Sequence, residues 1–478
     1  MLNKIAIEYN PQSTYPLVSP FSPSEIYREY KLKEISSEIN PVYSQVRSAL
    51  YDLGLDRDNF GKETWNPFSD FISPGNRVVI KPNWVREMNP LSDDISGLVS
   101  HPSVVRAVLD YVLLALKDEG EVIIGDAPIQ SADFEKLAER LKIDEVINFY
   151  NGKTGVKISV EDFRSEIKMY GPSGEVSCHK FSENKNFVNV DLAGDSFFEG
   201  VMDKFRKFRV TNYDPGRMFE YHGPGKNIYR IFKPVLEADV VINIPKLKTH
   251  RKAGITCCMK NSVGIIGTKD ALVHHTRGSR KEGGDAYPYF NILKWMNERM
   301  YEMREKTENA GLQKSLTFLI GMNDGIMKRL GTNLVFEGNW YGNMTLWRML
   351  LDINNILFYC DRNGIMKEDE QRKVFFLVDA VVGGEKDGPL KPVNKPAGLL
   401  IAGWNPVLID LISAKLIGFD YGKITTLSKA LENGFLGFNE GNIAESQVWF
   451  NGKMTGAAAL EAVAHFEPSA GWKKHIEA

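Results

Sequence analysis

Lysine, histidine and aspartate residues follow several short apolar runs of this sequence, and these residue types bind anions and transfer protons. The densest group is in the segment VVINIPKLKTHRKAGITCCMKNSVGI, which starts at Val240. Nine Lys or Arg residues and a single acid, Asp270, occur between Lys246 and Lys281. The pattern predicts a binding site for phosphate or carboxylate, because positive charge attracts these anions strongly where water is partly excluded. The alternative is a basic loop that only faces solvent.

The apolar run Val240–Ile244 predicts a buried strand, and we expect the chain to stay extended beyond it. Alternate residues of an extended chain share a face, so Lys246, Lys248 and His250 should point to one side. They would lie past the carboxyl end of the strand, where open parallel sheets bind ligands. We predict that His250 and Lys248 act in catalysis, with His250 as a general acid or base because its ordinary pKa is near neutrality. The residues predicted to bind substrate in this segment are Lys246, Lys260 and Asn261.

Three other apolar runs also end in polar residues that can act in binding or catalysis. Lys81 and Asn83 follow the first run, in IKPNW; Asp126 ends the second, in IIGDAP; and Asp379 ends the third, in FFLVDA. A carboxylate in such a place can hold a divalent cation, orient a lysine or form a turn. Because the strands of one parallel sheet end at the same edge, we expect these side chains to converge on one crevice.

A glycine-rich stretch, VVGGEKDGP, follows Asp379. It predicts a flexible loop in which two glycines offer backbone N–H groups to an anion, or alternatively a plain turn. The stretch is not a P-loop, and no GxGxxG motif follows a predicted strand. The residues predicted to bind substrate outside the basic segment are Lys81, Asn83, Gly383, Gly384 and Asp387. Asp126 and Asp379 are predicted to act in catalysis or to hold a divalent metal, Mg²⁺ or Mn²⁺.

The order of the predicted elements indicates an α/β fold. β-Branched runs at 78–80 and 122–124 are each followed by a helix, the first with Ser100 as its cap and Gly120 at its end. We therefore predict a mostly parallel sheet flanked by helices, with a β-rich insertion and an N-terminal extension. The expected divisions are an N-terminal extension at 1–75, the first half of the α/β core at 76–150, the insertion at 151–230, the second half of the core at 231–425 and a C-terminal segment at 426–478.

The composition limits which binding partners and which cellular compartment we expect. The formal net charge of the 478 residues is -2, so no overall charge draws the chain to nucleic acid or to an anionic membrane. The segment 247–281 contains no aromatic residue, although single-stranded nucleic-acid sites use aromatic side chains for stacking. The four cysteines form no CxxC pair, which argues against a disulfide framework, a zinc knuckle or an iron–sulfur motif. We expect a cytoplasmic protein without nucleic-acid or membrane partners; the sequence is compatible with a homo-oligomer.

The motifs KPNW, GDAP, PKLKTH…MKNSVG, GNMTLWRMLLDIN and VDAVVGGEKDGP resemble those of the DUF362 family, a domain of unknown function. The similarity runs from Arg77 to Gly418 and points to the longer branch of that family. It implies an α/β fold. Some members carry ferredoxin-like cysteine motifs, which this chain lacks. The family's motif positions fall here on Lys81, Asn83, Asp126, Lys246, Lys248, His250, Lys260, Asn261, Asp379, Asp387 and Asp410.

The function expected from these patterns is that of an enzyme acting on a small anionic substrate in a Lys- and His-rich crevice. Group transfer, ligation and acid–base chemistry fit equally well, and a lysine base or nucleophile is compatible with the clustered charges. The alternative is a non-catalytic assembly or carrier protein, related to iron–sulfur or other cofactors, that binds an acidic partner. A deep crevice would favour the enzyme, and a flat basic face would favour the carrier.

Overall fold

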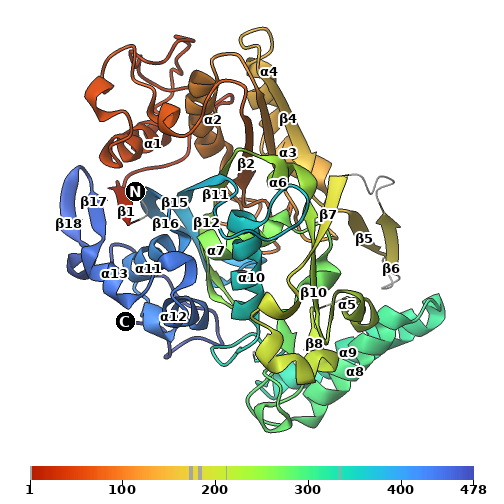
Figure 1. Ribbon diagram of the computed structural model, residues 1–478. Coiled ribbons are helices and arrows are strands. Elements are labelled where there is room, and N and C mark those ends of the chain that lie inside the picture. The colour runs from red at the N-terminus through yellow and green to blue at the C-terminus, as the bar shows by residue number, and fades with distance from the viewer. Residues whose placement is uncertain (1–2, 172–175, 181–185, 212, 333–334) are drawn as a thin grey trace.

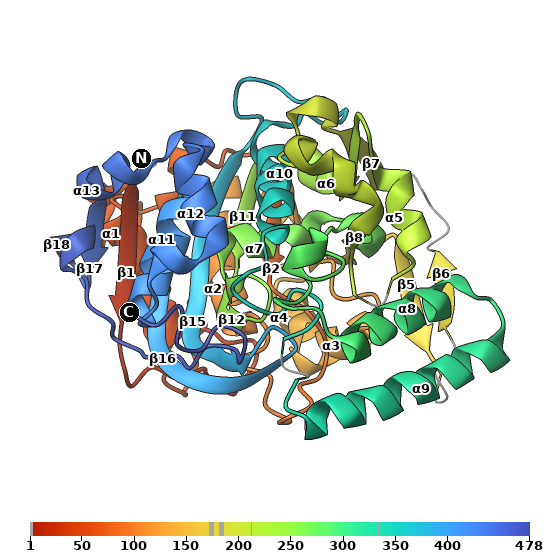
Figure 2. The same ribbon diagram turned by 90° about the horizontal axis from the view of Figure 1, so that it is seen from below.

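The computed structural model describes residues 3–171, 176–180, 186–211, 213–332 and 335–478. An eleven-stranded mixed sheet forms its centre, and helices cover both faces of this sheet (Figures 1 and 2). Nine strands follow one another in the order β18-β17-β1-β16-β15-β11-β2-β3-β4, and β12 and β13 extend the sheet beside β15. The α/β fold predicted from the sequence is therefore confirmed.

One half of the sheet is parallel. Ile242 lies opposite Ile80, and Ile80 lies opposite Ile124, so the neighbouring strands end at the same level. This half consists of β15 (Lys373–Asp387), β11 (Val240–Ile244), β2 (Arg77–Pro82), β3 (Glu121–Asp126) and β4 (Lys157–Asp162). The shared register brings the polar residues after β2 and β3 to one edge. The strand β4, which falls in the range expected to be an insertion, pairs with β3.

The other half is mostly antiparallel and brings together distant parts of the chain. Its strands are β16 (Lys391–Gly403), β1 (Lys4–Tyr9), β17 (Gln447–Phe450) and β18 (Lys453–Gly456). The N-terminal strand β1 lies between β16 and β17, and Ile5, Ala6 and Ile7 are fully buried. The N-terminal range thus contributes a strand to the central sheet, in addition to the segments that lie over it.

Side chains alternate between two hydrophobic cores, as expected for a sheet that is covered on both faces. Val78 and Ile80 pack on one face, with α1 (Pro41–Asp52) and α2 (Pro102–Leu116), and Val79 packs on the other. The helices on the second face are α7 (Cys258–Asn261), α10 (Leu346–Tyr359), α11 (Pro406–Leu416) and α12 (Thr425–Glu432). The helix α2 is capped by His101 and ends at Lys117 in a left-handed conformation, so both ends differ from those predicted.

The remaining elements form smaller layers around the sheet. Two helices, α8 (Ile292–Lys306) and α9 (Ala310–Arg329), make a hairpin at the periphery, and α9 was not predicted (Figure 2). No helix in the described parts of the chain combines the length and apolar character needed to cross a bilayer. The strands outside the central sheet are β5 (Glu166–Tyr170), β6 (Val176–Lys180), β7 (Phe187–Asp191), β8 (Phe208–Arg209), β9 (His222–Gly223), β10 (Lys226–Phe232) and β14 (His275–Thr276). Within the central sheet, β12 spans Lys246–His250 and β13 spans Gly254–Thr256. The other helices are α3 (Phe134–Arg140), α4 (Ile143–Phe149), α5 (Pro215–Tyr221), α6 (Lys233–Glu237) and α13 (Glu440–Glu445).

Candidate functional site

A cavity of about 320 Å³ lies where β2, β3 and β12 end, at the carboxyl edge of the parallel strands. This is the edge at which open α/β sheets bind ligands. Five residues predicted from the sequence line the cavity: Asn83, Asp126, His250, Lys260 and Asn261. The acidic and basic side chains of its lining are mainly cationic: Asp126, Lys168, His250, Arg251, Lys252, Lys260, Lys269, His274 and Glu337.

Lys81 and Asp126 form a buried ion pair at the base of this edge. Lys81 Nζ lies 2.9 Å from Asp126 Oδ1, and Lys81 is fully buried. Asp126 also accepts hydrogen bonds from the backbone N–H groups of Trp84, at 2.7 Å, and Ala127, at 2.9 Å. A divalent cation at Asp126 would have to displace these donors and the Lys81 ammonium. The ion pair therefore fixes the ends of β2 and β3 relative to each other.

Gly264 packs directly against this ion pair. A Cβ atom at Gly264 would lie 1.7 Å from Asp126 Oδ1 and 2.5 Å from Lys81 Nζ. The Gly264 carbonyl also accepts a hydrogen bond of 2.9 Å from the Ala127 N–H. Glycine is thus required here by the space that the charged pair occupies, rather than by the backbone conformation.

A chain of amide side chains links the cavity to the sheet. Asn83 Nδ2 donates to Asn261 Oδ1 at 2.8 Å, and Asn261 Nδ2 donates to Asn243 Oδ1 at 2.6 Å. Asn243 lies in β11 and was not predicted as a site residue. Asn83 Oδ1 is buried and has no hydrogen-bond partner among the described residues. Since an unmet buried acceptor is costly, this oxygen is available to a ligand hydroxyl or N–H group.

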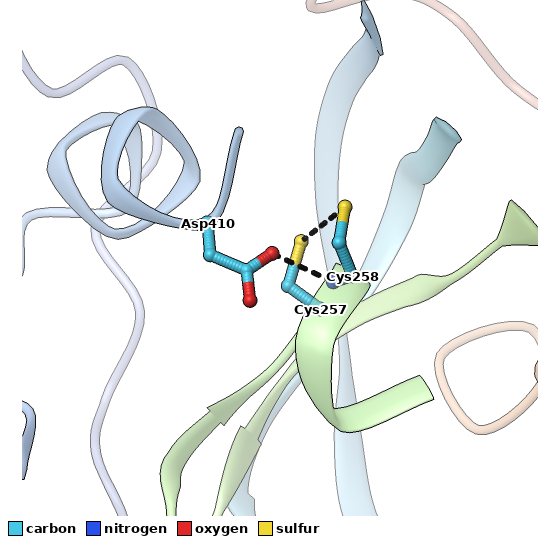
Figure 3. A group of neighbouring side chains, drawn as sticks. All are labelled: Cys257, Cys258 and Asp410. Carbon is cyan, nitrogen blue, oxygen red and sulfur yellow. Dashed lines mark hydrogen bonds between the residues drawn. The ribbon is translucent and has the colours of Figure 1, made fainter. Parts of the chain in front are cut away.

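The short helix α7 positions Lys260 and Asn261, and Asp410 of α11 holds its start. Asp410 accepts a hydrogen bond from the N–H group of Cys258 at 2.6 Å (Figure 3). It accepts a second from the N–H group of Met259 at 3.1 Å. Burial raises the pKa of Asp410 to about 6. Asp410 therefore acts on the cavity only through the placement of α7.

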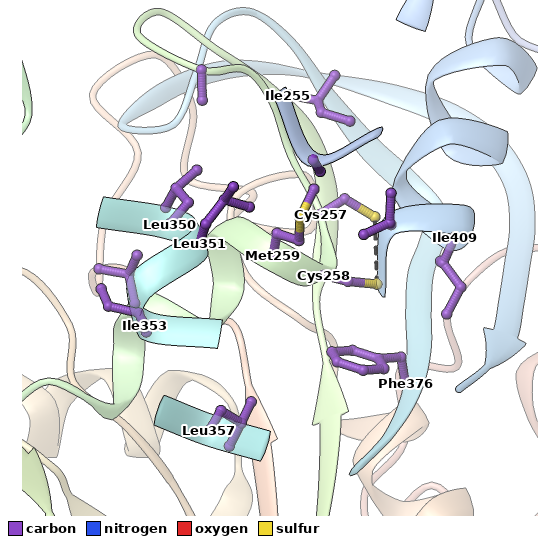
Figure 4. Close-up of a cluster of buried hydrophobic side chains, with 14 of the residues drawn as sticks. Ile255, Cys257, Cys258, Met259, Leu350, Leu351, Ile353, Leu357, Phe376 and Ile409 are labelled. Atoms are coloured by element: carbon purple, nitrogen blue, oxygen red, sulfur yellow. Dashed lines mark hydrogen bonds between the residues drawn. The ribbon is translucent and has the colours of Figure 1, made fainter. Parts of the chain in front are cut away.

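Cys257, Cys258 and Asp410 are the described residues whose potential ligand atoms come close enough to hold a metal ion, all within 4.8 Å of one another. Asp126 and Asp379 belong to no such group in the described parts of the chain. Both thiols are fully buried, and burial raises their pKa values. Figure 4 shows them among apolar side chains such as Leu350. Protonated thiols in an apolar core, beside a carboxylate that already caps a helix, fit a packing role.

Three lysines of the cavity have lowered pKa values. Burial is the main cause for each: it lowers the pKa to about 8 for Lys252, to about 8 for Lys260 and to about 7 for Lys269. Repulsion from Lys81 lowers the Lys260 pKa further, while Asp126 opposes the shift. An anion in the cavity would relieve both the desolvation and the repulsion. These amines are therefore prepared to bind negative charge.

His250 is oriented as a hydrogen-bond donor to the cavity. Its Nδ1 accepts from the backbone N–H groups of Lys252, at 3.0 Å, and Ala253, at 3.1 Å. Burial, followed by the charge of Lys260, holds the His250 pKa well below its usual range. A neutral imidazole that accepts at Nδ1 carries its proton on Nε2. Because that proton occupies Nε2, His250 suits the role of hydrogen-bond donor to an oxyanion better than that of a general base, one of the two roles expected from the sequence.

His274 carries its proton on the other ring nitrogen. Its Nδ1 lies 2.9 Å from the carbonyl oxygen of Leu272, which can only accept, so Nδ1 carries the proton. Burial and the charge of Lys260 also keep the His274 pKa well below its usual range. The Nε2 lone pair of a neutral His274 is therefore available to take up a proton. The adjacent His274-His275 pair is visible in the sequence, but only the hydrogen bond to Leu272 shows which ring nitrogen is basic.

Lys246 and Asp379 form a second buried cluster, which does not line the cavity. Lys246 Nζ lies 2.7 Å from Asp379 Oδ2 and donates to the Tyr15 hydroxyl at 2.7 Å. Asp379 also accepts from the Tyr15 hydroxyl and, at 2.8 Å, from the His101 N–H. Lys246 and Asp379 are fully buried. Their charges are thus satisfied within the protein, and the cluster holds the N-terminal region against β15.

Lys248 is also buried away from the cavity. Its Nζ donates to the carbonyl oxygen of Leu98, and burial lowers its pKa well below the usual range, with Lys246 adding repulsion. Lys246, Lys248 and His250 lie in an extended strand, β12, as expected. Nevertheless, only His250 reaches the cavity, because β15 lies beside the first two.

The glycine-rich stretch is part of a long strand, so the flexible loop expected there is wrong. Gly383 pairs with Lys395 and Gly384 with Asn394 in the β15–β16 ladder, which continues to Asp387. A Cβ at Gly383 would lie 2.4 Å from the Phe466 ring, and one at Gly384 would lie 2.5 Å from the Gly97 carbonyl. These glycines allow close packing. None of Gly383, Gly384 and Asp387 lines the cavity.

Lys252, Lys269, His274 and Glu337 were not predicted as site residues. The first three lie within the basic run, so the sequence did contain a signal for them. None of them directly follows a predicted strand, which was the feature used to select site residues. No feature of the sequence indicated Glu337 as a site residue. Its carboxylate accepts from Thr211 at 3.1 Å, and burial raises its pKa.

Together the sheet and the cavity define an α/β protein with a cationic, histidine-containing pocket at the carboxyl ends of its parallel strands. The family model of DUF362, described as a domain of unknown function, matches residues 78–193 and 197–415. The chain therefore belongs to the DUF362 family, as its motifs indicated.

Two individual proteins show weaker similarity. The thylakoid-associated protein sll1697 of Synechocystis is 23% identical over 238 residues, and the match covers 50% of this chain and 50% of that protein. The chain thus matches about half the length of this relative. A crystal structure of a Thermotoga maritima protein aligns with a TM-score of 0.33 and 10% identity, over 74% of this chain and 54% of the other.

Proposed function

We propose that this protein is an enzyme that transfers a proton on a small metabolite carrying a phosphate or carboxylate group. The observation that supports the proposal is the combination, in one cavity, of four lysines with two neutral histidines that carry their protons on different ring nitrogens. The volume of about 320 Å³ suits a small molecule.

The roles of the side chains follow from their hydrogen bonds. Lys252 and Lys269 would bind the anionic group, since both amines are held at the wall by backbone carbonyls of Glu337 and Ala127. His250 would donate a hydrogen bond from its Nε2–H group to a substrate oxygen that gains negative charge. His274 would accept the substrate proton at Nε2, because its Nδ1 already carries one. Neither aspartate predicted as catalytic, Asp126 or Asp379, has a part in these steps.

The alternative, a non-catalytic assembly or carrier protein that binds an acidic partner, is less well supported. A large partner would need a broad basic surface, whereas the cations described above surround a recess. We also propose a cytoplasmic location, because all four cysteines are free thiols.

The lysine roles can be tested by anion binding. We expect phosphate and small dicarboxylates to stabilise the wild-type protein in a thermal-shift assay and to bind in calorimetry. Lys252→Met and Lys269→Met should each weaken binding by roughly 10-fold or more, since a charge-assisted hydrogen bond contributes about 1.5–3 kcal/mol. Lys281→Met is the matched control, because Lys281 belongs to the same basic run but is exposed and lies outside the cavity. Equal affinity in all four proteins would refute the site.

The pH dependence of anion binding provides a second test. The pKa values of about 7 for Lys269 and about 8 for Lys252 mean that both amines are charged at pH 6 and lose protons as the pH rises. Affinity for sulfate, whose own charge is constant in this range, should therefore be highest near pH 6 and fall between pH 7 and 9. Calorimetry at several pH values measures this. An affinity that stays constant to pH 9 would contradict binding by these lysines.

A further inference from the structure

Lys260 differs from the other lysines of the cavity in having no partner. Lys252 Nζ donates to Thr211 at 3.2 Å, and Lys269 Nζ donates to the Ala127 carbonyl at 2.8 Å. In the described parts of the chain, no hydrogen bond or ion pair involves Lys260 Nζ. The side chain extends from α7, which Asp410 anchors to α11, so its base is held in place. An amine without an acceptor or counterion is free to react with a ligand.

The surroundings of Lys260 also favour the neutral, nucleophilic form of the amine. Its pKa of about 8 means that about a tenth of the amine is unprotonated at pH 7, far more than for an ordinary lysine with a pKa of about 10.4. Buried catalytic lysines that react with carbonyl groups are activated in this way, by desolvation and a nearby cation. Here the nearby cation is Lys81.

We infer that Lys260 forms an imine with an aldehyde or ketone that carries a phosphate or carboxylate group. The inference rests on the proposed function, because Lys252 and Lys269 would bind the anionic group and so bring the carbonyl to Lys260. It also narrows the substrate class to small oxo acids and phosphorylated carbonyl compounds.

The chemistry needs no reagent beyond the ligand and a proton. The Lys260 nitrogen attacks the carbonyl carbon and a C–N bond forms. The C–O π electrons move to the oxygen, which takes up one proton from solvent and becomes a hydroxyl group. His274 Nε2 accepts the proton that leaves the nitrogen and returns it to the hydroxyl group, which departs as water. The product is a protonated C=N bond on Lys260. The buried Asn83 Oδ1 offers an acceptor for the hydroxyl of the intermediate.

Reductive trapping tests this inference on the full-length protein. We would incubate it with pyruvate, glyoxylate or glycolaldehyde phosphate and sodium cyanoborohydride at pH 7.5, and then measure intact mass and map the modified peptide. We expect one adduct per chain, on Lys260, that forms at least about tenfold faster than adducts on exposed lysines. Phosphate should slow the reaction, and lactate, which has no aldehyde or ketone group, should give no adduct. Lys260→Arg should lose the adduct, whereas Lys281→Arg, at an exposed lysine outside the cavity, should react like the wild type.

The two hypotheses fail in different ways. If phosphate binds and depends on Lys252 and Lys269, but no probe modifies Lys260 selectively, the imine inference is wrong and the proposed anion site stands. If adducts are spread over surface lysines at the same rates in wild type and Lys260→Arg, the inference is equally overturned. If phosphate, sulfate and dicarboxylates all fail to bind, the proposed function itself is wrong. Mapping the wild-type adduct gives the answer even if Lys260→Arg does not fold.

Discussion

Replacing Asp379 by alanine should destabilise the protein by about 3–5 kcal/mol, because it leaves the fully buried Lys246 ammonium without its counterion. Tyr15 and the His101 N–H would lose the same acceptor. The free energy of unfolding in urea measures the effect. Phosphate affinity of the folded variant should stay within about twofold of the wild type, because the cluster does not line the cavity.

A double substitution distinguishes a structural role of Lys246 and Asp379 from a role in anion binding. Lys246→Met combined with Asp379→Leu removes both charges, and we expect it to recover most of the lost stability, since buried ion pairs can often be replaced by apolar residues. Reduced anion affinity in this folded double variant would show that Lys246 or Asp379 does act at the site. In that case the roles in binding and catalysis predicted from the sequence would be right, and the purely structural role of this ion pair would be wrong.

Gly264→Ala should have a similarly large effect. The new methyl group would overlap Asp126 Oδ1, at 1.7 Å, and crowd Lys81 Nζ, at 2.5 Å. Either the ion pair separates or the backbone of the segment after α7 moves, so we expect a loss of at least about 3 kcal/mol of stability. Anion affinity should also fall, because Asp126, Lys260 and Gly264 line the same cavity.

Gly321→Ala is the matched control for the glycine substitution. Gly321 lies within α9, and a Cβ there would meet nothing within 4 Å. Alanine is favoured over glycine in a helix by up to about 1 kcal/mol, so this variant should be as stable as the wild type or more stable. Unfolding curves of both variants, measured side by side, test the packing argument. A Gly264→Ala protein with wild-type stability would show that the ion pair can move without cost.

The local pattern of the sequence was sufficient to predict the class of fold and the meeting of polar residues at the edge of the sheet where the cavity lies. β-Branched runs followed by helices predicted the parallel strands, and the polar residues that end β2 and β3 were correctly expected to meet. These features depend on neighbouring residues and on the common direction of parallel strands, so they can be read along the chain. The DUF362 motifs added family membership, which the family model confirms.

The division of the lysines between cavity and core was decided only by the tertiary structure. Lys246, Lys248 and Lys260 are all lysines of one basic run, yet the first pairs with Asp379, the second donates to Leu98, and only the third faces the cavity. Asp379 is 133 residues from Lys246, and Tyr15 is 231 residues from it. A buried charge is fixed by the partner that neutralises it, and such partners come together only when distant segments fold onto the same sheet. For the same reason, the residue types alone do not reveal which ring nitrogen of His250 and of His274 carries the proton, because backbone contacts decide it.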